Sequence, residues 1–379
     1  MTKNNSCSQL RIITRVTAIA CFLSMLLCYK LWLSERNFPL SPVSDFLPAI
    51  PAPFDFFLFC IAAGLLICIA VFRAPQKFII AFIILAALFA IQDQNRWQPW
   101  FYQYLMMFFV LSFFNFRCDD VKQQNAIITI FKLMIACIYF WSGLQKMNAH
   151  FLGDTFPWLM EPITNHMSAG GIDHFKWLGY LFPLMEFLTG ICLLIQPLRK
   201  IALAMVVIMH LFILFALGPF GHNYNPVVWP WNFAMISFSI LLFYKSEAIS
   251  LLQLRSMLRY HSLKLVAILF IMMPLFNFFN LWDSYLSHNL YSGNTSNGVI
   301  YISDSVENRL PEHIKPYSNG EMNQNQINIK YWCMQELGVP AYPEKRNFEA
   351  VANTLYPYAK DSAEIYLMFS PKLKLNNLN

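Results

Sequence analysis

The chain has 379 residues, of which 57% are hydrophobic and only 13% are charged. Soluble domains carry about 25% charged residues, so this composition excludes an ordinary soluble globular protein. Repeated apolar runs of about 18 residues predict an integral membrane protein that lies in a lipid bilayer. The formal net charge of +6 comes from Lys and Arg clustered between these runs, which indicates membrane topology rather than binding to nucleic acid.

The apolar runs predict an all-α bundle of about nine transmembrane helices. The basic N-terminus is followed by an apolar stretch without a clear cleavage site, so we expect a retained first span rather than a removed signal peptide. The third and eighth runs are short and require tilt or local thinning of the bilayer. The predicted spans are 12–33, 54–73, 77–92, 100–116, 126–144, 178–196, 201–218, 232–244 and 263–281.

The distribution of basic residues predicts a cytoplasmic N-terminus. With that orientation, thirteen Lys and Arg residues fall on the cytoplasmic side and five on the other side, apart from the C-terminal tail. An odd number of spans then sends the tail outside. We expect a protein of a bacterial inner membrane. The five outer basic residues are Lys30, Arg36, Arg96, Lys146 and Lys176.

From Ser284 onward the composition becomes polar, which divides the chain into a membrane domain (1–283) and an extracytoplasmic C-terminal domain (284–379). The alternating segments 298–303, 327–332 and 363–369 have the pattern of strands, and 348–355 has that of a helix. The sequence therefore predicts a small α+β unit on the outer face of the helices.

Lys146 directly follows the fifth predicted span, in the segment Gly143-Leu-Gln-Lys-Met-Asn-Ala-His-Phe151. An ammonium at a membrane boundary is either an anchor whose charge reaches water or a working group in a pocket. The neighbouring aromatic and amide side chains are compatible with a pocket, and both alternatives stay open at this point.

Three unusual loops fall on the same predicted outer face: 93–100, 146–177 and 218–232. Their aromatic rings and polar groups could stack a flat ligand and bind its edges. The alternative is an aromatic belt, because Trp and Tyr gather at membrane interfaces. The candidate pocket residues are Arg96, Trp97, Gln98, Trp100, Asn148, His222, Asn223 and Trp229.

Glu186 and His210 lie inside predicted spans rather than at their ends. A carboxylate facing lipid costs on the order of 3 kcal/mol, so each residue requires an interior partner. We expect the two to pair, either as a structural clasp or as a proton relay. The nine cysteines contain no CxxC pair, and most lie within predicted spans, where a thiol is typical of a small packing residue. No compact metal-binding motif occurs, so we expect no metal.

Residues 143–151 resemble the Gly-x-x-Lys-Leu-Asp/Asn-x-x-Trp signature of the vitamin K-dependent gamma-carboxylase family and its bacterial relatives with an HTTM domain. The segments 183–186, 197–200 and 210–212 resemble that domain's order of a helix bearing Glu, a basic loop and a helix bearing His. The resemblance covers roughly residues 10–280. One departure is the segment 96–100, which has no histidine where the carboxylase carries Asn-Asn-His.

The resemblance implies an outward-facing site in which a reduced quinone, a vitamin K-like hydroquinone, is oxidised to make a strong base. In the carboxylase that base removes a proton from a glutamyl γ-carbon before carbon dioxide is added. Lys146 aligns with the lysine that deprotonates the hydroquinone. The sequence names no protein substrate, and the tail is far shorter than the lumenal part of the carboxylase. We therefore expect a quinol-linked enzyme acting on a lipid-soluble aromatic ligand, with a non-catalytic envelope accessory protein and a transporter as the alternatives.

Overall fold

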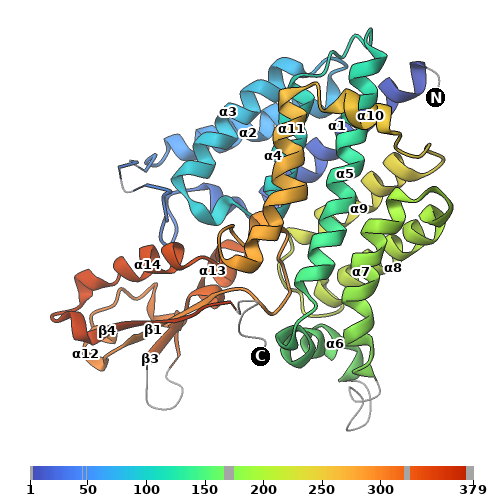
Figure 1. The fold of residues 1–379 in the computed structure, drawn as a ribbon. Coiled ribbons are helices and arrows are strands. Elements are labelled where there is room, and N and C mark those ends of the chain that lie inside the picture. The colour runs from blue at the N-terminus through green and yellow to red at the C-terminus, as the bar shows by residue number, and fades with distance from the viewer. Residues whose placement is uncertain (1–2, 45, 48, 166–174, 320–324, 373–379) are drawn as a thin grey trace.

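The computed structural model describes the chain apart from residues 1–2, 45, 48, 166–174, 320–324 and 373–379. It consists of a large helical bundle and a small mixed unit at one end (Figure 1). The prediction of a mostly helical protein with a small α+β tail is confirmed. Within the described residues, five helical segments are long and apolar enough to cross a membrane, namely Ser6–Leu27, Phe54–Val71, Val121–Gln145, Gln196–Leu217 and His261–Phe279.

The bundle is formed by helices that pack pairwise along their lengths, so that neighbours in sequence are mostly neighbours in space. Its helices are α1 (Lys3–Leu27), α2 (Phe54–Val71), α3 (Gln76–Gln92), α4 (Pro99–Ser112), α5 (Val121–Gln145), α6 (Phe156–Thr164), α7 (Leu178–Leu194), α8 (Arg199–Leu217), α9 (Val228–Phe243), α10 (Leu251–Met257) and α11 (His261–Ala267). Short turns of 3₁₀ or π-helix join several of them: η1 (Tyr29–Trp32), η2 (Gln94–Arg96), η3 (Phe151–Thr155), η5 (Gln196–Leu198), η6 (Ile268–Met272), η7 (Met273–Phe279) and η8 (Tyr285–Ser287).

The first and last predicted spans differ from the helices in their boundaries. The first begins and ends earlier than predicted, at Lys3 and Leu27, and continues as the 3₁₀ turn η1. The last is divided into α11, the π-helix η6 and the 3₁₀ segment η7. Pro274 stands at the start of η7, where a residue without an N–H group removes a helical hydrogen bond.

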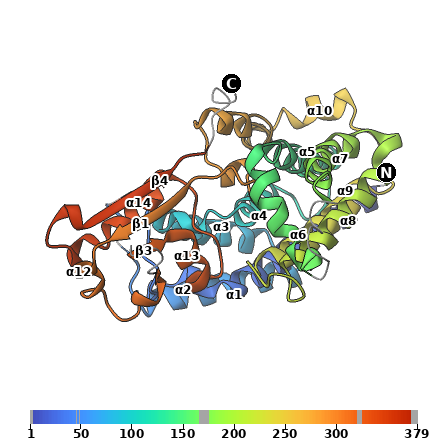
Figure 2. The same cartoon turned by 90° about the horizontal axis from the view of Figure 1, so that it is seen from below.

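The C-terminal unit contains a four-stranded antiparallel sheet with the order β2-β3-β1-β4. In Figure 1 the helices α13 and α14 lie between this sheet and the bundle, and Figure 2 shows the unit on the opposite side from α7 and α8. Its elements are β1 (Asn297–Ile302), α12 (Asp304–Glu307), η9 (Lys315–Tyr317), β2 (Ser318–Asn319), β3 (Asn325–Asn328), α13 (Ile329–Leu337), α14 (Lys345–Asn353), η11 (Tyr356–Tyr358), η12 (Ser362–Glu364) and β4 (Ile365–Ser370).

The prediction of a strand over 327–332 is wrong for most of that segment. The strand β3 ends at Asn328, and the helix α13 begins at the next residue. The side chain of Asn328 accepts a hydrogen bond from the Tyr331 N–H, so it caps the new helix. A capping residue in the middle of an alternating pattern changes the backbone from strand to helix.

The C-terminal unit is bound to the bundle by buried amides. Asn95, which belongs to η2, accepts hydrogen bonds from the Tyr342 N–H at 2.9 Å and from the Asn347 side chain at 3.0 Å. Gln98 donates to the Pro340 carbonyl at 2.9 Å. All of these bundle side chains are buried. An unpaired buried amide is costly, so separating the C-terminal unit from the bundle would expose or strand these amides. The hydrogen bonds therefore hold the two parts of the chain in one packed structure.

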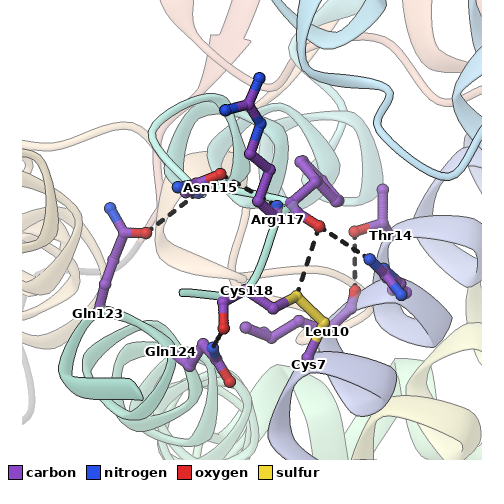
Figure 3. The surroundings of a disulfide bond; sticks show 10 residues. Cys7, Leu10, Thr14, Asn115, Arg117, Cys118, Gln123 and Gln124 are labelled. Atoms are coloured by element: carbon purple, nitrogen blue, oxygen red, sulfur yellow. Dashed lines mark hydrogen bonds between the residues drawn. A yellow bond between two sulfur atoms is a disulfide. The ribbon is translucent and has the colours of Figure 1, made fainter. Parts of the chain in front are cut away.

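A disulfide joins Cys7, near the start of α1, to Cys118, in the loop between α4 and α5 (Figure 3). The Cα atoms are 5.9 Å apart, although the residues are separated by 111 positions in sequence. Arg11 donates to the main-chain carbonyl of Phe116 at 2.8 Å, which fixes the same loop to the same helix. Both cysteines lie outside the predicted spans, and their pairing was not predicted from the sequence.

The redox state of this pair in living cells tests the predicted orientation. A cytoplasmic N-terminus places Cys7 and Cys118 in a reducing compartment, where disulfides are rare. We therefore expect both to be thiols in cells that are acid-quenched, denatured and alkylated, so that all nine cysteines react. After mild oxidation only the seven other cysteines should react. A pair already oxidised in untreated wild-type cells, but not in a Cys7→Ser control, would place this face on the oxidising side.

Candidate functional site

Two glycines bring α5 and α7 into close contact at the level of Lys146. A Cβ atom on Gly143 would lie 2.3 Å from the main-chain nitrogen of Phe187. A Cβ on Gly190 would lie 2.5 Å from the carbonyl oxygen of Ala136. Small residues of this kind let the backbones of two membrane helices approach. The approach places the C-terminal end of α5 beside the middle of α7.

Lys146 forms an ion pair with Glu186 across this contact. The Lys146 Nζ is 2.9 Å from the Glu186 carboxylate and 2.5 Å from the Ser142 hydroxyl oxygen. The two charged side chains are only 14% and 19% exposed. An anchor would extend its ammonium to water. The Lys146 side chain instead points to the carboxylate of a neighbouring helix.

His210 has different partners from those predicted. Its Nε2 is 2.7 Å from the Tyr139 hydroxyl, and its Nδ1 is 2.5 Å from the Asn232 side-chain oxygen. The predicted direct pair of Glu186 and His210 is therefore wrong. The carboxylate pairs with an ammonium, while the imidazole is held by two neutral groups from α5 and α9. Both arrangements satisfy polar side chains inside the bundle.

These polar groups meet at one cavity of about 90 Å³, which we call the central cavity. A connected hollow of about 60 Å³ shares Tyr139, Lys146, Glu186 and His210 with it. The remaining wall is apolar and aromatic, which is typical of a small-molecule site. The central cavity is lined by Ile138, Tyr139, Ser142, Lys146, Leu159, Glu186, His210, Ile213, Leu217, Val228, Trp231, Asn232, Met235, His288, Leu290 and Tyr291.

His288 is the feature of this wall that sequence reasoning missed. The residue is 2% exposed, and neither ring nitrogen has a hydrogen-bond partner among the described residues. Burial lowers the pKa of His288 to about 3, so the ring is neutral at pH 7 and offers one donor and one acceptor. A buried polar group without a partner is costly, and its place on the cavity wall leaves it available to a ligand. No local pattern in the sequence marks it.

The loop before α4 does not line this cavity. Arg96 is buried and donates to two main-chain carbonyls, so it holds the ends of other helices together. Trp97 and Gln98 also donate to main-chain carbonyls. Trp100 packs in the core against other aromatic rings. The assignment of these four residues to the pocket is wrong, because the first three use side-chain donors to fix the backbone and Trp100 is part of the aromatic core.

The other predicted pocket residues also lie outside the central cavity. Asn148 donates to two main-chain carbonyls. His222 stacks on Trp158 and lies 2.6 Å from its carbonyl oxygen. Trp229 donates to a carbonyl at the end of α8, and the exposed Asn223 adopts a left-handed turn conformation. Of the predicted site residues, the structure brings together Lys146, Glu186 and His210.

The side chains that line the central cavity have the chemistry to bind a small ring with polar edges. An ion pair, a hydrogen-bonded tyrosine and a free imidazole are spread over an apolar wall, so oxygens at different edges of a ring could each find a partner. A volume of about 90 Å³ suits a small head group. Among the described residues no cluster of three His, Cys, Asp or Glu side chains could hold a metal. His166 and His174 lie outside the described residues.

Comparison with known proteins returns no match to a family model, a curated protein or a solved structure. The resemblance to the carboxylase family thus stays a prediction. The function proposed below rests on the geometry of the central cavity.

Proposed function

We propose that the chain crosses a bacterial inner membrane nine times, with a cytoplasmic N-terminus and an extracytoplasmic C-terminal unit. The five long apolar helices supply five of these segments, and α3, α4, α7 and α9 supply the others. The support is that each shorter helix packs along one or more of the long ones. Buried on several sides, a short helix does not need to match the full thickness of the bilayer.

We infer that the central cavity binds a lipid-soluble aromatic compound of the reduced quinone class, and that the protein acts on it chemically. The observation that carries this proposal is the meeting of the Lys146–Glu186 ion pair with the unpartnered His288 on the wall of one cavity. Ionisable groups inside a membrane bundle are costly and are typical of function. A purely structural pair would not require an empty apolar space beside it.

Lys146 is proposed as the proton acceptor. In the ion pair its ammonium can first pass a proton to Glu186, because the two groups are at hydrogen-bond distance, 2.9 Å apart. This transfer leaves a neutral amine and a neutral carboxylic acid, and the amine can then accept a proton from an acidic hydroxyl in the cavity. A bound quinol would supply that hydroxyl, and its anion would then pass two electrons to dioxygen, so that quinol and dioxygen give quinone and hydrogen peroxide. The hydroxyl of Ser142 holds the lysine in place.

The first experiment is lipid extraction and mass spectrometry of the purified protein. A co-purifying quinone supports the proposal. The second measurement is the binding of menadiol, a small quinol, followed by quenching of tryptophan fluorescence, since Trp231 lines the cavity. Absence of both a bound quinone and menadiol binding would contradict the proposal and favour an accessory protein or a transporter.

Two substitutions then separate chemistry from binding. Lys146→Arg keeps the positive charge but essentially cannot lose a proton. We expect it to bind menadiol within about threefold of wild type, yet to catalyse the oxidation of menadiol by dioxygen about 10²-fold more slowly, the usual loss when a general base is removed. Glu186→Gln should slow oxidation as well. Lys122→Arg is the matched control, because Lys122 is exposed at the other end of α5. Full activity of Lys146→Arg would exclude Lys146 as the base.

A further inference from the structure

A second, larger cavity of about 410 Å³ lies between the bundle and the C-terminal unit, and we call it the outer cavity. It is bounded by η3 and α6, by the loop before α9, by the segment that follows η8 and by α13. Leu290 and Tyr291 line both this cavity and the central one. The two spaces are therefore separated by one layer of side chains.

The outer cavity contains a cation without an acidic partner. Lys330, on α13, donates from its Nζ to the Thr295 hydroxyl at 3.1 Å, and within the described ranges it forms no salt bridge. Other basic residues of the C-terminal unit do have acidic partners, such as Arg309 with Glu364 at 2.9 Å. Burial lowers the pKa of Lys330 to about 8, so the ammonium lacks full hydration. An anion placed beside it would restore the missing interaction.

Aromatic rings form the wall opposite this charge. Trp158 stacks on Tyr291 with ring centroids 6.2 Å apart, and meets Tyr224 edge-on at 5.4 Å. The Tyr291 hydroxyl accepts a hydrogen bond from Asn225 at 2.7 Å, which fixes the ring. Asp154 also lines the cavity, where its exposed carboxylate lies 3.4 Å from the His150 ring nitrogen and its charge is screened by water. Rigid rings of this kind stack flat ligands.

We propose that the outer cavity is a binding site for an organic anion with a flat, apolar body, whose acidic group pairs with Lys330 while its ring packs against the aromatic side chains of the cavity wall. This site goes beyond the proposed chemistry of the central cavity and does not depend on it. A carboxylate beside Lys330 replaces lost hydration with a charge-assisted hydrogen bond. The ring contributes apolar burial in a space several times larger than the central cavity.

The test compares 2-naphthoate with the neutral 2-naphthamide, two probes of the same shape that differ in charge. Binding to the full-length protein in detergent is measured by calorimetry. We expect wild type to bind naphthoate at least tenfold more tightly than naphthamide. Lys330→Gln should weaken naphthoate binding about tenfold or more and leave naphthamide unchanged. Lys330→Arg should restore naphthoate binding to within about threefold, because the charge is retained.

Lys345→Gln is the matched control, since Lys345 is an exposed lysine of the same unit paired with Glu349. It should leave both probes unaffected. Lys146→Gln separates this proposal from the previous one, because it removes the charge of the central cavity. Loss of naphthoate binding in that variant, with Lys330→Gln unaffected, would place the probe in the central cavity. Equal binding of the two probes to wild type would also overturn the proposal.

The pH dependence supplies a readout that needs no substitution. The free lysine loses its proton as the pH rises past about 8, so naphthoate affinity should be full below that value and fall above it. The other titratable groups lining the cavity are the exposed Asp154 and three tyrosines. Burial raises the pKa of Tyr224 to about 12 and raises the pKa values of Tyr285 and Tyr291 as well, so the tyrosines stay neutral. Naphthoate binding that is constant between about pH 6.5 and 9.5 would contradict the role of Lys330.

Discussion

Lys146→Ala and Glu186→Ala should each destabilise the protein, and the double substitution should cost less stability than the sum of the two single losses. Each single substitution leaves a charge without its partner in a site that is less than one-fifth exposed. The double substitution removes both charges. We expect a coupling energy of about 1–3 kcal/mol, measured as a less-than-additive loss of thermal stability in detergent.

The control cycle joins Glu186 to His210, the pair that the sequence predicted. The structure binds His210 to Tyr139 and Asn232, so this second cycle should show the smaller coupling. If the Glu186–His210 cycle shows the larger coupling and the Lys146–Glu186 cycle is additive, the packing of α5 against α7 is wrong at this level.

The second large effect is expected for Asp93→Ala. Asp93 pairs with Arg36 at 2.5 Å, and both side chains are fully buried. Its other carboxylate oxygen accepts hydrogen bonds from the main-chain and side-chain nitrogens of Asn95. Removal of one partner of a buried, hydrogen-bonded ion pair costs about 3–5 kcal/mol, because the other charge is left in a low-dielectric site. We expect a clear fall in the midpoint of thermal unfolding.

Asp119→Ala is the matched control, because Asp119 is exposed in the loop between α4 and α5. It should change the thermal midpoint little. Arg36→Met should be as damaging as Asp93→Ala, since it leaves the carboxylate unpaired. Equal small shifts for Asp93→Ala and Asp119→Ala would mean that this ion pair contributes nothing to stability.

The sequence was sufficient to predict a mostly helical protein with long apolar segments and a small α+β tail, because composition and apolar run length depend on the bilayer rather than on tertiary contacts. It also located Lys146, Glu186 and His210, since ionisable residues stand out against apolar runs. Their pairing was not predictable from span order alone. The signal that would have helped is the presence of Gly143 and Gly190, each three or four residues from one of the charges, because glycines mark where two helices approach.

The remaining features depend on contacts between distant segments. Arg96 and Gln98 have the composition of a ligand site, but the packing directs their donors to main-chain carbonyls. His288 and Lys330 belong to polar stretches in which neither stands out, and only the fold places each beside a cavity. Cys7 and Cys118 are brought together by the return of the chain after four helices.

The bonds between Asn95 and the C-terminal unit have a consequence for biosynthesis. Asn95 and its partner Asn347 are separated by 252 positions, so the first is inserted long before the second is translated. At about 5–20 residues per second, the delay is roughly 13 to 50 s. During that interval the amide of Asn95 has no partner from the unit that later buries it. A chain whose synthesis stops before Asn347 therefore keeps this contact surface open, with the Asn95 amide without the partner that the complete chain supplies.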